Sequence, residues 1–237
     1  MTKPLFIALD FDKEADMWAL LKQLDPSQEI HVKVGMEMFY QYGSEIVREL
    51  SDKGFKIFLD LKLHDIPNTV KRSAKQLAKL GVYCTTVHAL GGKEMIKAAK
   101  EGLIAGTPAG KPVPKLLAVT ELTSISEEVL KDEQHCSLPL KDEVKALAHQ
   151  AQEAGADGII CSPLEVAGMK AEFPDDFMFV TPGIRPKNYQ KDDQARVTTP
   201  AQARKNGSSA IVVGRPITQA ADPAKAYQEI LQDWREN

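Results

Sequence analysis

The sequence predicts an α/β fold, a single-domain (β/α)8 barrel (a TIM barrel) over residues 1–237. Eight short apolar runs rich in β-branched residues alternate with segments of helical periodicity. Helical crossovers make consecutive strands parallel, and 237 residues are enough for eight such units. A doubly wound sheet is the alternative, but the first run ends in Asp10-Phe11-Asp12 without the GxGxxG turn of that fold.

The predicted elements follow one another in strict alternation. Apolar runs predict strands at residues 5–10, 30–35, 55–62, 82–88, 115–120, 158–162, 177–181 and 209–214. Apolar residues three or four positions apart predict the helices, at residues 14–23, 43–53, 67–80, 93–103, 141–154, 164–171, 200–205 and 222–234. Pro67 suits the first turn of the third helix.

Two longer connections follow predicted strands at the end where barrel active sites lie. They are residues 124–140, after the fifth strand, and residues 183–197, after the seventh. The second connection is polar, and we predict that it forms a mobile lid.

The composition is that of a globular protein with small ligands. Apolar residues make up 43% of the chain, and 30 basic against 33 acidic residues give a net charge of −3. The basic residues are dispersed, which argues against nucleic-acid or membrane binding. No apolar run approaches the roughly 20 residues of a membrane span, and the N-terminus lacks the features of a signal peptide. We therefore expect a cytoplasmic protein.

The cysteines and histidines predict no metal centre. Cys84, Cys136 and Cys161 are scattered without CxxC spacing, which is typical of reduced thiols. His64 and His88 lie near strand ends without the spacing of a metal site. We expect them to have structural roles.

Charged residues interrupt strands that should be apolar on both faces. The third strand reads Phe58-Leu59-Asp60-Leu61-Lys62-Leu63. Because side chains alternate along a strand, Asp60 and Lys62 share one face and the leucines share the face that helices cover. We therefore expect Asp60 and Lys62 in the barrel mouth, within reach of Lys33 on the neighbouring strand.

A structural ion-pair cluster is the alternative explanation, because buried charges are costly unless they are paired. Asp65 falls just past the third strand, so four charges converge on the catalytic end of the barrel. An apolar filling would stabilise a barrel more simply, and the charges therefore favour a functional site.

A second candidate site lies at the ends of the last two strands. Gly214 allows close backbone approach to a ligand, and Arg215 offers a planar cation for phosphate oxygens. A tight turn with a surface arginine is the alternative. Residues 181–185 (TPGIR) at the end of the seventh strand favour phosphate binding, because barrel enzymes often bind phosphate after strands seven and eight.

The segment at residues 58–70, FLDLKLHDIPNTV, resembles the signature of the orotidine 5'-phosphate decarboxylase family. Its DxKxxD core is shared with other phosphosugar decarboxylases and synthases, whereas DLKLHDIPxT is more specific. Further motifs occur in the family's order along the whole chain, at residues 8–10, 32–35, 87–89, 120–124, 181–185 and 213–215. Leu90 departs from the pattern, because a smaller residue is expected before Gly91-Gly92.

The resemblance implies an enzyme without metal or cofactor that converts orotidine 5'-phosphate to UMP and CO2 in pyrimidine biosynthesis. Lys62 would deliver a proton to C6 of the pyrimidine, and Asp60 would stand beside the substrate carboxylate. Lys33 would orient Asp60 and contact the ribose. Asp65 and Thr69 would come from the neighbouring subunit, so the resemblance also implies a homodimer with active sites at its interface.

The remaining residues would contact the nucleotide. The resemblance places Asp10 at a ribose hydroxyl, Thr123 and Ser124 near the base, and Pro182 and Arg185 in the loop after the seventh strand. It assigns the base-and-phosphate clamp to Gln194, Gly214 and Arg215.

Two other functions stay open. A magnesium-dependent DxKxxD decarboxylase or aldolase-like synthase would lose activity with EDTA. A non-catalytic sensor of a phosphate ligand would bind without turnover, and it leaves the lysine–aspartate array unexplained.

Overall fold

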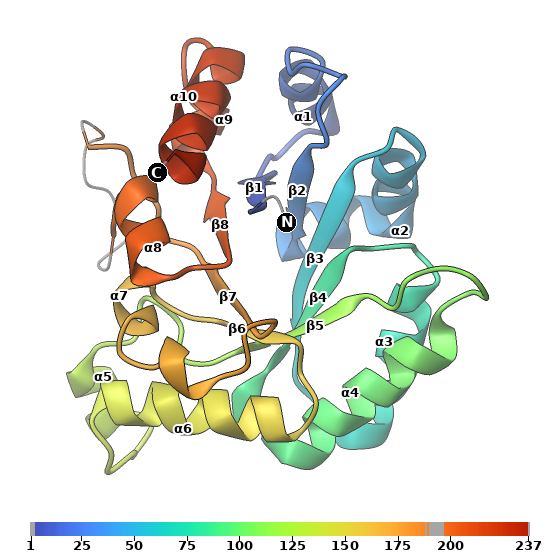
Figure 1. The fold of residues 1–237 in the computed structure, drawn as a ribbon. Coiled ribbons are helices and arrows are strands. Elements are labelled where there is room, and N and C mark those ends of the chain that lie inside the picture. The colour runs from blue at the N-terminus through green and yellow to red at the C-terminus, as the bar shows by residue number, and fades with distance from the viewer. Residues whose placement is uncertain (1–2, 188, 190–196, 237) are drawn as a thin grey trace.

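The computed structural model describes residues 3–187, 189 and 197–236. Eight parallel strands close into a barrel in which β8 pairs with β1, so the predicted (β/α)8 fold is confirmed (Figure 1). The strands are β1 (Leu5–Ala8), β2 (His31–Gly35), β3 (Lys56–Leu63), β4 (Cys84–His88), β5 (Lys115–Val119), β6 (Gly158–Ile160), β7 (Met178–Thr181) and β8 (Ala210–Val213).

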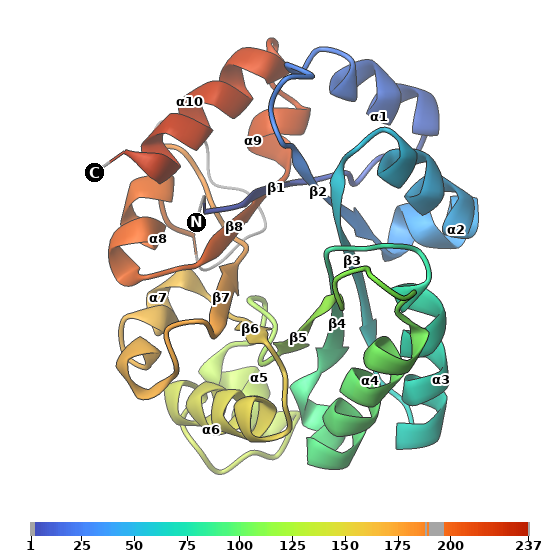
Figure 2. The same cartoon turned by 45° about the vertical axis from the view of Figure 1, so that its right-hand side comes forward.

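The helices form an outer ring around these strands, which Figure 2 shows from another side. They are α1 (Glu14–Leu21), α2 (Met36–Asp52), α3 (Pro67–Ala78), α4 (Gly92–Gly106), α5 (Glu127–Asp132), α6 (Leu140–Glu153), α7 (Pro163–Val166), α8 (Pro200–Asn206), α9 (Arg215–Thr218) and α10 (Pro223–Arg235), with short 3-10 turns η1 (Ala89–Gly91) and η2 (Lys170–Glu172). None of the helices described has the length and apolar character needed to cross a bilayer.

Several predicted helix limits were wrong for identifiable reasons. The second helix begins at Met36, and Gly43 kinks it with a φ of 66° instead of starting it. The predicted helix at 164–171 is split into α7 and η2. The predicted connection at 124–140 contains α5, whose N-cap Ser126 accepts a hydrogen bond from the amide of Val129 at 3.2 Å.

Apolar side chains pack both inside and outside the strands. Phe6, Phe58, Leu117 and Val180 come from alternate strands and form an interior layer, as is typical of this fold. Larger clusters fill the space between the strands and the helices. The interior layer closes the barrel below its carboxyl end, so a ligand has access from that end.

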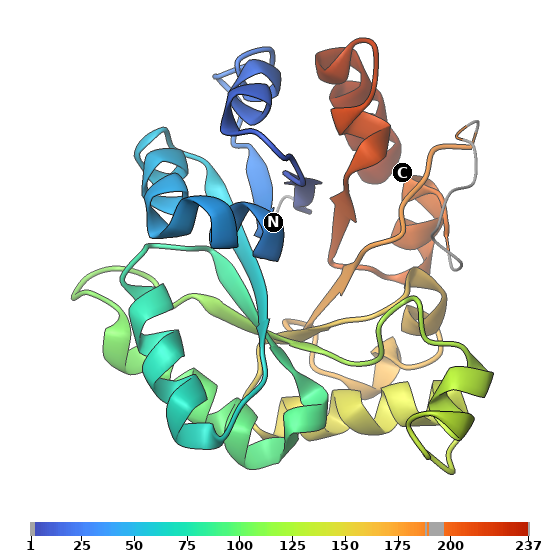
Figure 3. The same ribbon diagram turned by 180° about the vertical axis from the view of Figure 1, so that it is seen from behind.

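The two ends of the chain meet where the barrel closes. The helices after β8 lie beside α1 in Figures 1 and 3. The indole nitrogen of the buried Trp234, in α10, donates to the carbonyl oxygen of Lys3 at 3.2 Å. Closure brings residues of β1 and β8 to the same side of the barrel mouth.

Candidate active site

A cavity of about 350 Å³ lies at the carboxyl ends of the strands. This volume is in the range of small-molecule sites. The predicted residues that line it are Asp10, Lys33, Asp60, Lys62, Thr123, Pro182, Arg185, Gly214 and Arg215. Residues near the start and the end of the chain therefore meet around one space.

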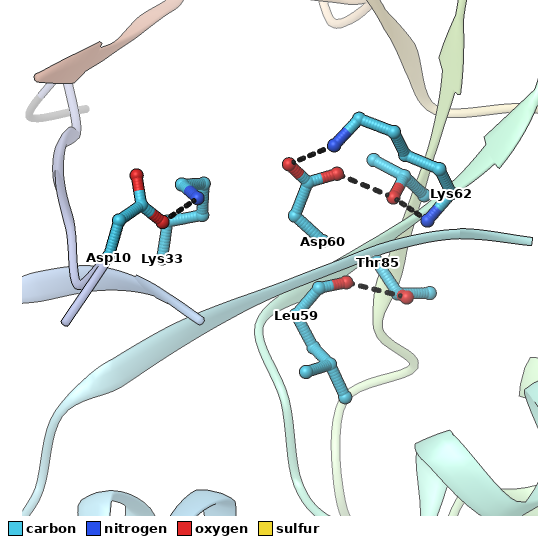
Figure 4. A network of polar contacts seen from close by, with 7 residues as sticks. Asp10, Lys33, Leu59, Asp60, Lys62 and Thr85 are labelled. Atoms are coloured by element: carbon cyan, nitrogen blue, oxygen red, sulfur yellow. Dashed lines mark hydrogen bonds and ion pairs between the residues drawn. The ribbon is translucent and has the colours of Figure 1, made fainter. Parts of the chain in front are cut away.

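Asp60 and Lys62 lie together in this cavity, where the sequence predicted them. The ammonium nitrogen of Lys62 is 2.7 Å from Oδ2 of Asp60, and the two side chains face each other in Figure 4. The other carboxylate oxygen, Oδ1, accepts a hydrogen bond from the hydroxyl of Thr86 at 2.8 Å. Both carboxylate oxygens of Asp60 are thus occupied by donors.

The regular alternation of β3 fails at Lys62. Its φ is 50°, in the left-handed region that few residues other than glycine adopt. The pairing of β3 with β4 shifts register between Leu59 and Leu63. The sequence gives no sign of this bulge, because lysine is not a residue that favours positive φ.

Lys33 has a different partner from the one that the resemblance implied. Its ammonium nitrogen lies 2.8 Å from Oδ1 of Asp10 (Figure 4). Asp60 is held instead by Lys62 and Thr86. A Cβ at Gly35 would lie 3.0 Å from Nζ of Lys33 and 3.3 Å from Oδ1 of Asp10. Glycine at this position therefore leaves room for the ion pair.

Asp65 and Thr69 do not line the cavity of their own subunit. Both are exposed, and Oδ1 of Asp65 accepts a hydrogen bond from the amide of Ile66 at 2.7 Å, just before α3. Their contribution to a neighbouring subunit stays a prediction.

The predicted phosphate-binding residues lie on the β7 and β8 side. Arg185 is buried, its Nη1 donates to the carbonyl oxygen of Ile184 at 2.9 Å, and its guanidinium lies 5.5 Å from the centre of the Tyr189 ring. Arg215 begins α9, directly after Gly214. This side of the cavity carries two permanent cations.

Two predicted contacts are not placed in the cavity. Ser124 is exposed and does not line it, although its neighbour Thr123 does. Gln194 lies outside the described residues, as does most of the predicted lid.

The sequence interpretation missed Thr86 and Glu121. Thr86 is fully buried, and Glu121 is 3% exposed and lines the cavity. Glu121 follows β5 at its carboxyl end, so the signal that identified Asp60 would also have found it. A threonine within a strand is an ordinary strand residue, and only the structure reveals the contacts of Thr86.

Two groups near the charge pair, His88 and Cys84, have pKa values shifted toward their neutral forms. Burial, followed by the charges of His64 and Lys62, lowers the pKa of His88 below its ordinary value. Burial and then the charge of Asp60 raise the pKa of the Cys84 thiol well above its ordinary value.

Among the described residues, no cluster of three or more His, Cys, Asp or Glu side chains is arranged to hold a metal ion.

A comparison with protein families matches residues 3–230 to the orotidine 5'-phosphate decarboxylase / HUMPS family. The chain belongs to this family. An orotidine 5'-phosphate decarboxylase from Lactobacillus delbrueckii subsp. bulgaricus is 81% identical over 237 residues, which cover 100% of this chain and 99% of that protein. The one from Lactobacillus acidophilus is 58% identical over 234 residues, 99% of this chain and 100% of that protein. These relatives identify the chain as an enzyme of the carboxy-lyase class.

Solved structures agree with this membership. The crystal structure of orotidine 5'-phosphate decarboxylase from Lactobacillus acidophilus matches with a TM-score of 0.89 and 55% identity over 98% of this chain and 99% of that chain. The enzyme from Pyrococcus horikoshii matches with a TM-score of 0.77 over 98% of this chain and 100% of that chain, and at 22% identity it supports the fold alone.

Proposed function

We propose that the chain converts orotidine 5'-phosphate to UMP and CO2, using a lysine–aspartate array and no cofactor. The observation that carries this proposal is the pairing of Lys62 with Asp60 at 2.7 Å inside a cavity whose other side presents Arg185 and Arg215. A reacting end and an anion-holding end are thus separated within one site.

The ammonium of Lys62 suits the chemistry of the departing carboxylate. When the bond between C6 and the carboxyl carbon breaks, CO2 leaves and the electron pair stays on C6 of the pyrimidine. An ammonium beside C6 stabilises this charge and then transfers its proton to the carbon. The electron pair ends in the new bond between C6 and hydrogen, so the reaction needs no electron acceptor. Lys62 then regains a proton from solvent.

Asp60 adds an electrostatic effect on the substrate. Two carboxylates about 4 Å apart repel by about 4 kcal/mol at an effective dielectric constant near 20. The hydrogen bonds from Lys62 and Thr86 keep the Asp60 carboxylate in place. A substrate carboxylate held beside it is therefore destabilised until CO2 departs.

Binding of the nucleotide phosphate offsets that repulsion. Arg215 and Arg185 supply cations away from the reacting carbon, and Gly214 carries no side chain that would block the backbone. Binding energy from a remote group can offset strain at the reacting group. Asp10 and Lys33, which form an ion pair between these two ends, are suited to the ribose hydroxyls.

The homodimer is part of this proposal. Large apolar side chains are exposed just after β2, β3 and β4, with exposed fractions of 40% for Met36, 75% for Tyr40, 67% for Ile66 and 47% for Leu90. Ile66 is next to Asp65. Exposed apolar side chains after the carboxyl ends of three neighbouring strands favour a second copy that covers them and supplies Asp65 and Thr69 to the neighbouring site.

The test is an absorbance assay in which the purified protein is mixed with orotidine 5'-phosphate in the presence of EDTA and the loss of pyrimidine absorbance is followed. We expect equimolar UMP and CO2 at a rate that EDTA does not change. Activity that EDTA removes and magnesium restores would favour the metal-dependent alternative. Binding of the nucleotide without turnover would favour the sensor.

A further inference from the structure

We infer that Thr86 is a positioning residue, whose hydroxyl holds Lys62 in its left-handed conformation and aims the carboxylate of Asp60. The inference rests on the proposed roles of Lys62 and Asp60 and adds a residue that touches both. Thr86 itself lies in β4, is fully buried and does not line the cavity.

The directions of the hydrogen bonds at Thr86 are fixed by chemistry. Its Oγ1 lies 2.9 Å from the backbone nitrogen of Lys62 and 2.8 Å from Oδ1 of Asp60. A backbone amide can only donate, so Oγ1 accepts from Lys62. The single hydroxyl proton is then left for the carboxylate of Asp60.

The irregularity in β3 explains why a side chain is needed here. Leu59 pairs with Thr85 and Leu63 pairs with Val87, so β3 advances four residues while β4 advances two. A bulge of this kind takes backbone groups out of the ladder. The hydroxyl of Thr86 accepts the amide hydrogen of Lys62 inside this irregular stretch of β3.

The backbone of Lys62 is strained, and Thr86 offsets part of that strain. A positive φ is unfavourable for a residue with a side chain, because Cβ comes too close to the following carbonyl oxygen. A hydrogen bond at the amide favours the observed conformation over an extended one. In this conformation the ammonium reaches Oδ2 of Asp60 at 2.7 Å. Asp60, Lys62 and Thr86 thus form a closed ring of three hydrogen bonds.

The neighbouring residue Thr85 provides a matched control. It is also fully buried in β4, but its hydroxyl donates to the carbonyl oxygen of Leu59 at 2.8 Å (Figure 4). Thr85→Val therefore removes the same group from the same pair of strands without touching Asp60 or Lys62.

The experiment compares turnover of orotidine 5'-phosphate by wild type, Thr86→Val, Thr86→Ser and Thr85→Val. We expect Thr86→Val to lower kcat about tenfold or more, because a hydrogen bond to a charged group is lost. KM should stay within about threefold, since the cations on the far side of the cavity are unchanged. Thr86→Ser should restore kcat, and Thr85→Val should keep it even where Tm falls. Thr86→Ala, with the same expected loss, replaces Thr86→Val if that variant does not fold.

A second measurement does not depend on the reaction. Amide hydrogen exchange by NMR should show the Lys62 amide protected in wild type and Thr86→Ser, and exposed to exchange in Thr86→Val. A folded Thr86→Val protein with near-normal kcat and a protected Lys62 amide would overturn the inference. If wild type itself has no decarboxylase activity, the proposed function fails, and the exchange data decide whether Thr86 holds Lys62.

Discussion

Lys62 combines a strained backbone with a central place in the cavity. Among the described residues, the only others with positive φ are glycines and His135, which lies in an exposed loop. Lys62 is inside a strand, where a regular conformation would cost less. Strain of this kind persists where surrounding contacts impose it, often at functional sites. The conformation of Lys62 therefore supports the functional role that we propose for this residue.

Arg215 represents the opposite end of the site. We expect Arg215→Ala to raise KM for orotidine 5'-phosphate about tenfold or more, because a charged hydrogen bond contributes about 1.5–3 kcal/mol. The change in kcat should be smaller, since the reacting groups are untouched. Steady-state kinetics provide the test, with the exposed Arg235 in α10 replaced by alanine as control. An unchanged kcat/KM in Arg215→Ala would remove Arg215 from the phosphate site.

Strands and helices could be predicted where a local pattern of apolar residues in the sequence indicates them. All eight strands lie where the apolar runs predicted, because burial on both faces leaves a continuous apolar signature. The short helices α5 and α9 were missed because a helix of only four to six residues is too short to show helical periodicity in its sequence. The bulge at Lys62 depends on the register between β3 and β4, which no local pattern encodes.

Two glycines in α4 bring this helix against α3. A Cβ at Gly102 would lie 2.3 Å from the carbonyl oxygen of Lys71, and one at Gly106 would lie 2.1 Å from that of Lys75. We expect Gly102→Ala to lower the free energy of unfolding by about 1–3 kcal/mol through overpacking, despite the better helix propensity of alanine. Urea unfolding would measure this. Gly168→Ala, whose nearest neighbour would be at 3.5 Å, is the control. Equal stability of the two variants would contradict this close packing.

Closure of the barrel assembles the site from the whole chain. The sequence predicted that Asp60, Lys62 and Lys33 share the barrel mouth, and the structure places all three there. The fold class accounts for this agreement, whereas the bulge at Lys62 departs from the strand alternation on which the prediction relied. The sequence could not predict that Lys33 pairs with Asp10 or that Thr86 bonds to Asp60. Those contacts join residues of different strands, and the distances between them depend on how far neighbouring strands of the barrel are staggered along each other.

The proposed dimer has a direct consequence for mixtures of inactive variants. If Asp65 acts on the neighbouring subunit, a dimer of one Lys62→Ala chain and one Asp65→Ala chain keeps one unaltered site. Random reassociation should then restore about a quarter of wild-type activity, because half of the dimers are mixed and each has one intact site. The assay is turnover after joint refolding, with each variant refolded alone as control. A mixture as inactive as its components would contradict sharing of the site.

The most direct test of the central claim is the turnover number of Lys62→Ala beside wild type, measured as CO2 released from orotidine 5'-phosphate in EDTA. We expect a folded variant that still binds the nucleotide and whose turnover is almost abolished, because no Lys62 ammonium remains beside C6 to stabilise the electron pair and protonate the carbon. Release of CO2 and UMP at a rate near that of wild type would contradict the central claim.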